Sequence, residues 1–494
     1  MKIALLPLDE RPVNTRLVRD IAAIGGHHVL LPPASLLPRM RRPGRPDELA
    51  AWLTAISDGV DAAVLCVDLL CFGGLIASRT SSDSVLDAFG RLAVLSALRA
   101  AHPRVDLSAV SLVMRASDSY DNTEEPQYWS DYGRDLHRLG GRLHAAVVSD
   151  AVGAPVEPAA ASVPREVVAD FEQRRLRNHL VNLECLRLHS SGLLDALVIT
   201  ADDTAVRSAG SAEQLWLRHW RRALGLEGVT AMYPGADEVG AVLIARAVGR
   251  GRPEIRVRVV TPDPAALAIV PPYENGPLDD ALTLQITAAG GVRVGMGEAA
   301  EIVMVVHPPN GRGDDWYQEV PPEIEPDEAA ATAELVASQL ATGTPVAVAD
   351  VRHTNGGDPA LVAALAARGA IEPLIGYGGW NTASNAIGSA VAAAMVTAHA
   401  RAAGTVDEAA RRRLVLHRVL EDVGYQSVIR AGLLARARRS GEAVDPVRLL
   451  PFVAAELADY LRRIAPREEW RVERVRLPWE RLFEVDFELA PANR

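Results

Sequence analysis

Short, uninterrupted apolar runs alternate along the chain with longer amphipathic stretches. Ten apolar runs predict β-strands, at residues 2–7, 28–31, 62–67, 109–114, 196–200, 229–233, 255–260, 301–306, 345–351 and 371–377. Helical patterns between them include residues 164–189 and 326–341, and both open with proline, which the first helical turn tolerates. This alternation is typical of βαβ units and parallel sheets. Because the strands are apolar without clean alternation, we expect helices on both faces.

The distribution of the strands predicts how the chain is organised. Six predicted strands precede residue 245 and four follow it. We expect an α/β fold of parallel sheets with covering helices, in which residues 1–250 form a TIM-barrel-like first part. Residues 251–400 are expected to form a smaller α/β part that contributes to the site, and residues 401–494 a helical region with a docking C-terminal arm.

Some stretches carry weaker patterns. Residues 251–295 show little periodicity and residues 308–326 are rich in proline, glycine and acids, so we expect both to be loop-like. Arginines in the predicted helices are expected on solvated faces: Arg174, Arg175 and Arg177 in residues 164–189, and Arg411, Arg412, Arg413 and Arg418 in residues 405–465.

Composition places the chain among globular proteins with a large core. Its 494 residues are 49% hydrophobic and 23% charged, and 63 acidic against 52 basic residues give a net charge of −11. This acidic balance disfavours nucleic acid and anionic membrane as partners. No apolar run reaches the 18 or so residues of a membrane span, and the N-terminal run is too short for a signal peptide. With three cysteines and no C-x-x-C, we expect reduced core thiols and a cytoplasmic protein.

Basic residue usage removes several mechanisms. Lys2 is the only lysine, so 51 of the 52 basic residues are arginine. A phosphate-loop lysine, a Schiff-base lysine and a lysine general base are therefore excluded. The G-x-S-x-G and H-E-x-x-H motifs are absent as well. We predict no cofactor and assign no metal ligand, although a mixed carboxylate and imidazole site drawn from a few strand-end residues stays open, namely Asp9, Asp202, Asp237, His307 or His353.

Paired acids follow two of the predicted strands, at the edge where ligands bind in parallel α/β folds. Asp202 and Asp203 follow the fifth strand, and Asp237 and Glu238 follow the sixth. Two carboxylates this close raise the pKa of one of them, which suits a general acid at neutral pH. We predict these four residues to be catalytic. Helix capping is the structural alternative.

Polar and aromatic residues at other strand ends are candidates for substrate binding. Asparagine amides donate to and accept from hydroxyl groups, and a tryptophan face stacks on a sugar ring. The candidates are Asp9, Glu10, Arg11, Asn14, Arg115, Tyr120, His353, Asn355, Asp358, Trp380, Asn381 and Asn385. For Asp358, which precedes a proline, helix capping is also expected. For the glycine-rich segment around Trp380, the alternative is a tight turn with the indole as a core plug.

Arginines lie near the carboxyl ends of four predicted strands, at Arg11, Arg79, Arg115 and Arg352. A planar guanidinium binds a carboxylate or phosphate through two parallel hydrogen bonds. Any of these arginines left free would favour an anionic ligand, whereas neutralisation of neighbouring acids is the structural alternative.

The motifs DERPVN, ADDT, YPGADEVG, HTNGGDPAL and GYGGWNTASNAIG together resemble the bacterial family catalogued as domain of unknown function 4127. The resemblance runs from Leu6 to the LPWERLFE segment at residues 477–484. It implies one integrated full-length unit with its polar motifs at strand ends, and it brings no assigned reaction. The long helix, apolar strand and Asp202–Asp203 pair are also similar to barrel glycosidases acting on N-acetylhexosamines. That looser similarity implies acid and acetamide-orienting roles for the two aspartates.

Two hypotheses follow. The first is a hydrolase of the glycosidase type that acts on a small sugar or glycoside, N-acetylated or anionic, by carboxylate acid–base catalysis, which needs neither cofactor nor lysine. The second is a non-catalytic or metal-dependent protein that binds a small anionic metabolite. Under both hypotheses the partner is a small molecule, and under the first it is a carbohydrate. Assembly into a homo-oligomer stays open.

Overall fold

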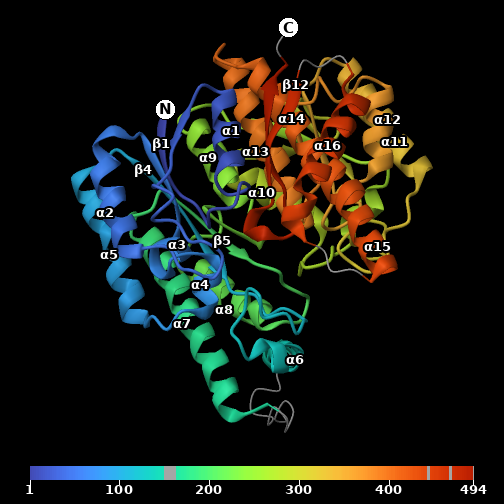
Figure 1. Cartoon of the computed structure of the whole chain (residues 1–494). Coiled ribbons are helices and arrows are strands. Elements are labelled where there is room, and N and C mark those ends of the chain that lie inside the picture. Colours follow the sequence, from blue (N-terminus) through green and yellow to red (C-terminus); the bar gives the residue numbers. More distant parts are fainter. Residues whose placement is uncertain (149–162, 442–444, 467–469, 493–494) are drawn as a thin grey trace. The chain divides into compact units, whose positions relative to one another are not determined.

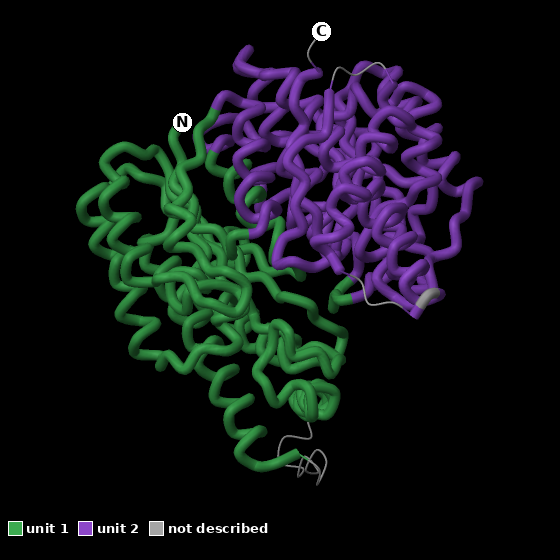
Figure 2. Tube along the Cα trace, viewed as in Figure 1, with its two compact units in different colours: residues 1–10, 27–247, 273–276 green, residues 11–26, 248–272, 277–494 purple. Residues whose placement is uncertain are grey.

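The computed structural model describes residues 1–148, 163–441, 445–466 and 470–492. Within these ranges the chain divides into two compact units (Figure 2). Unit 1 consists of residues 1–10, 27–247 and 273–276, and unit 2 of residues 11–26, 248–272 and 277–494. Residues 251–400 share a unit with residues 401–494 apart from 273–276, and the expected division into three parts stays a prediction.

Unit 1 is built on a parallel sheet in the order β2-β1-β3-β4-β5-β6. Its strands are β1 (Lys2–Leu6), β2 (His28–Leu30), β3 (Ala62–Cys66), β4 (Asp106–Val113), β5 (Ala196–Ala201) and β6 (Thr230–Pro234). The helices are α2 (Pro46–Ile56), α3 (Val67–Phe72), α4 (Leu75–Thr80), α5 (Val85–Ala101), α6 (Trp129–Val148), α7 (Arg165–Ser190), α8 (Ala209–Ala223) and α9 (Val239–Gly249) (Figure 1). Every residue of β3, β4 and β5 is buried, as expected for strands covered on both faces.

Unit 2 repeats this strand order in a second parallel sheet, β8-β7-β9-β10-β11. The strands are β7 (Ile255–Val260), β8 (Gly291–Val294), β9 (Ile302–His307), β10 (Val346–Asp350) and β11 (Gly376–Gly378). The helices are α1 (Arg16–Ile24), α10 (Leu278–Ala288), α11 (Pro326–Ala341), α12 (Pro359–Ala367) and α13 (Ala383–Ala402). In each sheet the first strand has the second on one side and the third on the other, an order shared by many doubly wound proteins.

Two glycines in β11 let α13 lie directly against the second sheet. A Cβ added to Gly376 would stand 2.5 Å from the carbonyl oxygen of Ala390, and one added to Gly378 would stand 2.1 Å from that of Ala386. The helix is buried from Ala383 to Ala400. These glycines thus serve strand–helix packing, which agrees with the alternative of a tight turn before a core helix.

The C-terminal part of unit 2 is helical and ends in a hairpin. It contains α14 (Glu408–Val419), the π-helical segment η3 (Leu420–Arg430), α15 (Ala431–Ser440) and α16 (Pro446–Ile464). The antiparallel strands β12 (Trp470–Arg476) and β13 (Asp486–Pro491) follow. The predicted C-terminal helical region is confirmed, and the docking C-terminal arm stays a prediction.

The predicted α/β fold with parallel sheets and covering helices is confirmed, and the barrel-like character of the first part stays a prediction. All ten predicted strands are present, although the last begins at Gly376 instead of residue 371. The loop-like reading of residues 251–295 is wrong, because α10 and β8 lie there. The expectation of solvated helix arginines is wrong for four of the seven, which are buried in polar contacts: Arg175, Arg177, Arg411 and Arg418. The other three, Arg174, Arg412 and Arg413, are partly exposed.

Candidate functional site

The strand order places a change of winding direction between β1 and β3, where ligands bind in open α/β sheets, outside the carboxyl ends of the strands. Asp9 follows β1, and Asp68 lies in the first turn of α3, directly after β3. Both are almost fully buried. Asp68 accepts a hydrogen bond from the backbone N–H of Leu112, at the end of β4, at 3.1 Å. Carboxyl groups therefore line this edge of the sheet from β1 to β5.

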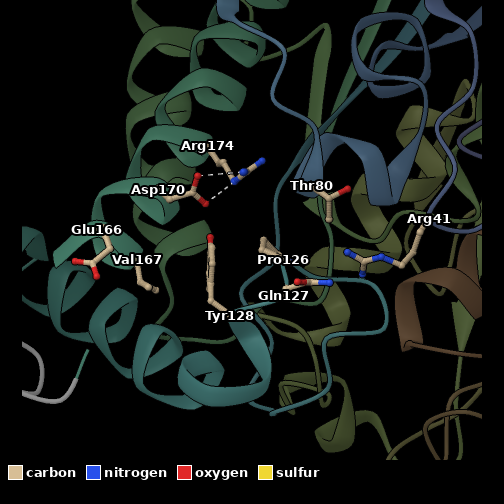
Figure 3. A pocket seen from close by; sticks show the side chains of 9 residues that line it. All are labelled: Arg41, Thr80, Pro126, Gln127, Tyr128, Glu166, Val167, Asp170 and Arg174. Carbon is tan, nitrogen blue, oxygen red and sulfur yellow. Dashed lines mark hydrogen bonds and ion pairs between the residues drawn. The ribbon is translucent and has the colours of Figure 1, made fainter. Parts of the chain in front are cut away.

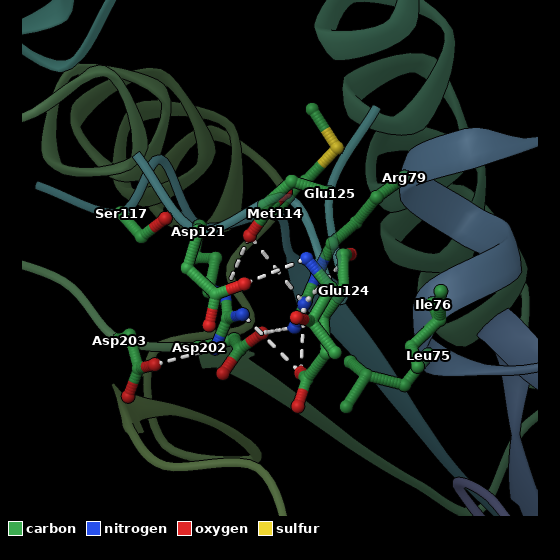
Figure 4. Close-up of polar contacts among 12 residues, drawn as sticks. Leu75, Ile76, Arg79, Met114, Ser117, Asp121, Glu124, Glu125, Asp202 and Asp203 are labelled. Carbon is green, nitrogen blue, oxygen red and sulfur yellow. Dashed lines mark hydrogen bonds and ion pairs between the residues drawn. The ribbon is translucent and has the colours of Figure 1, made fainter. Parts of the chain in front are cut away.

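Two arginines and four acids form what we name the carboxylate–arginine cluster of unit 1 (Figure 4). Its members are Arg79, Arg115, Glu124, Glu125, Asp202 and Asp203. They come from α4, from the long connection after β4 and from the end of β5.

Each arginine of the cluster binds several acids. Arg79, which is 1% exposed, pairs with Asp202 and lies 3.4 Å from Glu124 and 3.6 Å from Glu125, measured from Nη1 to Oε2 and Oε1. Arg115 donates from Nε to Glu125 Oε1 at 2.7 Å, from Nη1 to Asp203 Oδ2 at 2.7 Å and from Nη2 to Glu124 Oε2 at 3.2 Å. Two cations thus hold four carboxylates.

Burial and neighbouring charges shift the pKa values of these acids by different amounts. Burial, followed by the Asp202 charge, raises the pKa of Asp203 to about 6 even though Arg115 opposes the shift. Burial raises the pKa of Asp68 to about 7, and Asp202 adds to the shift. Asp203 has a φ of +29°, an uncommon value for a residue other than glycine. Its side chain is 28% exposed, so part of it is accessible.

The capping alternative for Asp202 and Asp203 is wrong. Helix α8 is capped by Ser208, whose side chain accepts a hydrogen bond from the Ser211 N–H at 3.0 Å. The two aspartates instead bind different arginines, Arg79 and Arg115. Prediction from strand ends therefore found the acids, but it did not assign Arg79, Glu124, Glu125 or Asp68 to the site.

The second acid pair lies at the end of β6 and has a different environment. Glu238 is fully buried, and its Oε2 accepts a hydrogen bond from the Ala236 N–H at 3.0 Å. Burial raises the pKa of Glu238 to about 8, helped by the charges of Asp237 and Glu274. This carboxyl group is therefore protonated at neutral pH and stabilises the turn before α9.

The remaining predicted residues of the N-terminal half are spread over both units. Glu10 accepts from the Met40 N–H at 3.0 Å in unit 1. Tyr120 is 46% exposed, and its ring lies under the Arg134 guanidinium, 5.2 Å from it. Arg11 and Asn14 belong to unit 2, where Arg11 pairs with Glu484 at 3.0 Å.

The carboxyl edge of the second sheet gathers the later candidates around a buried histidine. His307, the last residue of β9, contacts Asp358 Oδ2 through Nε2 at 3.1 Å and Thr332 Oγ1 through Nδ1 at 2.8 Å. Asp358 also accepts from the Ala360 N–H at 2.7 Å, so the capping expectation is confirmed. Asp350 accepts from the Tyr377 hydroxyl at 2.7 Å, and burial raises the pKa of this carboxyl to about 6.

The π-helical segment η3 holds the loops that follow β10 and β11. The Asp422 side chain accepts from the Gly379 N–H at 2.8 Å, and Arg430 donates to the Asn355 carbonyl at 2.7 Å. Asn355 in turn donates its N–H to the Asn381 carbonyl at 2.9 Å, and both asparagines have positive φ values, +58° and +66°. π-Helical turns occur often at functional sites. This edge is therefore held in a strained and specific arrangement.

The aromatic and amide candidates of unit 2 are buried at the same edge. His353 is 5% exposed and meets Trp316 edge-to-face at 5.6 Å between ring centroids. Among the described residues, neither of its ring nitrogens has a hydrogen-bond partner, and burial lowers the pKa of the ring to about 4. Trp380 is 3% exposed and packs on Phe483, and Asn385 lies in the first turn of α13. The structure thus places the predicted residues in two groups, one in each unit.

All four strand-end arginines pair with acids. Arg11, Arg79 and Arg115 have the partners given above, and Arg352 binds Glu325 and Glu328. Neutralisation of neighbouring acids is therefore what each of them does.

Three findings concern metals, thiols and membranes. In the described part of the chain, no group of three or more His, Cys, Asp and Glu side chains is arranged to hold a metal ion. Cys66, Cys71 and Cys185 are buried free thiols. Over the same residues, no helix combines the length and apolar character needed to cross a bilayer.

These features define a two-unit α/β protein with polar side chains at the carboxyl edges of both parallel sheets. The chain belongs to the family described as protein of unknown function (DUF4127), whose model matches residues 3–488. The resemblance drawn from the motifs is confirmed over essentially the full length. No curated protein and no solved structure matches the chain.

Proposed function

We propose that this protein is a hydrolase of the glycosidase type, acting on a small sugar or glycoside, with its acid–base chemistry in the carboxylate–arginine cluster. The observation that carries the proposal is the unequal environment of two adjacent acids. Asp202 is 9% exposed and bound to a buried arginine, whereas Asp203 is 28% exposed and has a pKa of about 6. Pairs of acids with different environments are how enzymes assign acid and base roles at one pH.

The chemistry assigns one role to each aspartate. Protonated Asp203 donates its proton to the glycosidic oxygen while the bond between that oxygen and the anomeric carbon breaks. A water molecule adds its oxygen to the anomeric carbon, and its proton passes to a carboxylate. Asp202, fixed by Arg79, serves as that base or orients an acetamido group of the substrate. No cofactor enters this scheme, and a cytoplasmic location belongs to the same proposal.

The alternative of an anion-binding protein has less support in this cluster. It depended on strand-end arginines that are free to bind a carboxylate or phosphate. Arg79 and Arg115 already bind four carboxylates between them. An anion placed there would have to displace the carboxylates that these arginines already bind.

Turnover of a panel of p-nitrophenyl glycosides, including N-acetylhexosaminides and uronides, tests the proposal. We expect one class to be hydrolysed, with kcat/KM falling as the pH rises above about 6, because Asp203 must be protonated to act as the acid. Asp203→Asn should lower kcat by about 10²–10⁴-fold, the usual contribution of general acid catalysis.

The matched control is Asp58→Asn, which makes the same change at a side chain that is 95% exposed. It should leave kcat unchanged. If no glycoside in the panel is hydrolysed, or if both asparagine variants keep wild-type rates, the proposal is wrong.

A further inference from the structure

Unit 1 also contains a pocket of about 410 Å³ (Figure 3). This volume lies within the range of about 300–1,000 Å³ that is common for small-molecule sites. The pocket is lined by Arg41, Thr80, Pro126, Gln127, Tyr128, Glu166, Val167, Asp170 and Arg174. Thr80 follows Arg79 in the chain, and Pro126 follows Glu125. Two walls of the pocket are thus continuous with the carboxylate–arginine cluster.

The cation of this pocket without an acid partner is Arg41. Its Nη1 donates to three backbone carbonyls, those of Asn122 at 2.7 Å, Thr123 at 3.0 Å and Glu125 at 2.9 Å. No carboxylate of the described residues forms an ion pair with it. The carbonyls fix the position of the guanidinium without neutralising its charge. Figure 3 shows Arg41 at one end of the lining, with its guanidinium directed towards the interior.

The opposite end of the pocket has a different chemistry. Arg174 is neutralised by Asp170, through Nε to Oδ2 at 2.6 Å and Nη2 to Oδ1 at 3.0 Å. The Tyr128 hydroxyl points towards this pair in Figure 3, and burial together with Asp170 raises the pKa of the phenol, so it stays a donor. Glu166 is exposed at the same end. This end offers an aromatic wall, a hydroxyl and carboxylates, groups that bind sugar hydroxyls.

We propose that this pocket binds an acidic sugar, with the sugar carboxylate held by Arg41 and the hydroxylated ring lying against Tyr128. One unneutralised guanidinium matches one negative charge. A phosphate dianion would exceed that charge, and the exposed carboxylate of Glu166 would repel it. The inference names the substrate class of the proposed hydrolase. Binding of the sugar does not depend on the proposed function, whereas its hydrolysis does.

Calorimetric titration of the full-length chain with free monosaccharides tests the inference; these have no glycosidic bond to hydrolyse, so binding is measured without turnover. D-Glucuronate should bind at least about tenfold more tightly than D-glucose, the range of a charge-assisted hydrogen bond. Acetate at equal concentration should not displace it. Arg41→Gln keeps a donor for the carbonyls and removes the charge, and it should abolish this preference, whereas Arg41→Lys should restore part of it. Arg42→Gln, the same change one residue outside the lining, should leave it intact.

Measurements without any substitution at Arg41 can already overturn the inference. They do so if the two sugars bind equally, if neither binds, or if acetate displaces D-glucuronate. Equal effects of Arg41→Gln and Arg42→Gln in variants whose circular dichroism matches the parent would also overturn it. The two proposals fail separately. If no glycoside is hydrolysed, the proposed hydrolase function is wrong. If D-glucuronate is not preferred over D-glucose, only the assignment of the pocket is wrong.

Discussion

Replacement of Arg79 by methionine tests whether the carboxylate–arginine cluster is held together electrostatically. Arg79 is 1% exposed and is the ion-pair partner of Asp202, whose side chain is 9% exposed. Methionine fills much of the same volume and carries no charge. Glu124 and Glu125 keep Arg115, but Asp202 becomes a buried charge without its cation. Removing one partner of a buried ion pair costs about 3–5 kcal/mol. For a unit of this size, 1 kcal/mol shifts the Tm by about 2–4 °C, so we expect a fall of about 6–20 °C.

The sign of the pH dependence follows from Asp203. Arg79 lowers the pKa of this carboxyl group, so its removal raises that pKa further above about 6. A carboxyl group whose pKa is raised in the folded state costs stability as the pH rises towards that pKa, so the variant loses more stability than the wild type between pH 5 and pH 8. The difference from the wild type should therefore be smaller at pH 5 than at pH 8. Adding Asp202→Asn should recover at least half of the loss.

Thermal unfolding followed by circular dichroism at the two pH values provides the measurement, with the transitions assigned separately because the two units need not unfold together. Arg45→Met is the matched control. It removes an arginine from an exposed pair with Glu48, whose side chains are 60% and 54% exposed, and such pairs contribute about 0–1 kcal/mol. If both variants lose the same small amount at both pH values, the cluster is not the cooperative unit described.

Two further predictions concern packing and protonation. Glu238→Gln should cost less than about 1 kcal/mol at pH 6, because the buried carboxyl with a pKa of about 8 is already neutral there. Between about pH 4.5 and pH 8 the wild type should lose stability as the pH rises, because the unfolded chain releases the proton that folded Glu238 keeps, whereas the glutamine variant should not; a parallel decline in both would contradict this. Gly378→Ala should destabilise unit 2 by about 1–3 kcal/mol or more, because the new Cβ would stand 2.1 Å from the Ala386 carbonyl oxygen. Gly90→Ala, in open space within α5, should instead stabilise by up to about 1 kcal/mol, and chemical denaturation of both variants decides.

Patterns of apolar residues predicted the sheets well because their strands are buried on both faces. β3 and β4 contain no exposed position, so each reads as an uninterrupted apolar run. The same reasoning missed α10 and β8. In α10 the buried face includes a polar residue, Gln285, which donates to the Ser384 carbonyl at 2.7 Å. That residue breaks the apolar period. β8 has only four residues at the edge of its sheet.

The candidate site could be predicted only where its residues follow strands directly. Asp202 and Asp203 stand immediately after β5, so strand position alone pointed to them. Their arginine partners, Arg79 and Arg115, also stood near strand ends, but position alone did not show which acids they bind. Asp422 carries no such signal, because it reaches the second edge from a π-helical segment more than forty residues after the end of β11. Which distant element supplies a partner depends on tertiary packing.

The near absence of lysine gains a physical meaning from these contacts. Arg175 binds both oxygens of Glu213, at 2.7 and 2.8 Å, and two further backbone carbonyls, while its own side chain is 3% exposed. Arg115 likewise reaches three carboxylates through three different nitrogens. An ammonium group offers one centre of charge on a flexible stem and cannot hold such a set in fixed directions. Four helix arginines that were predicted to face solvent, Arg175 among them, are therefore buried and bind several groups each. Arg41 differs from these arginines because it binds backbone carbonyls alone. It is therefore the cation of its pocket that can bind a carboxylate of a ligand.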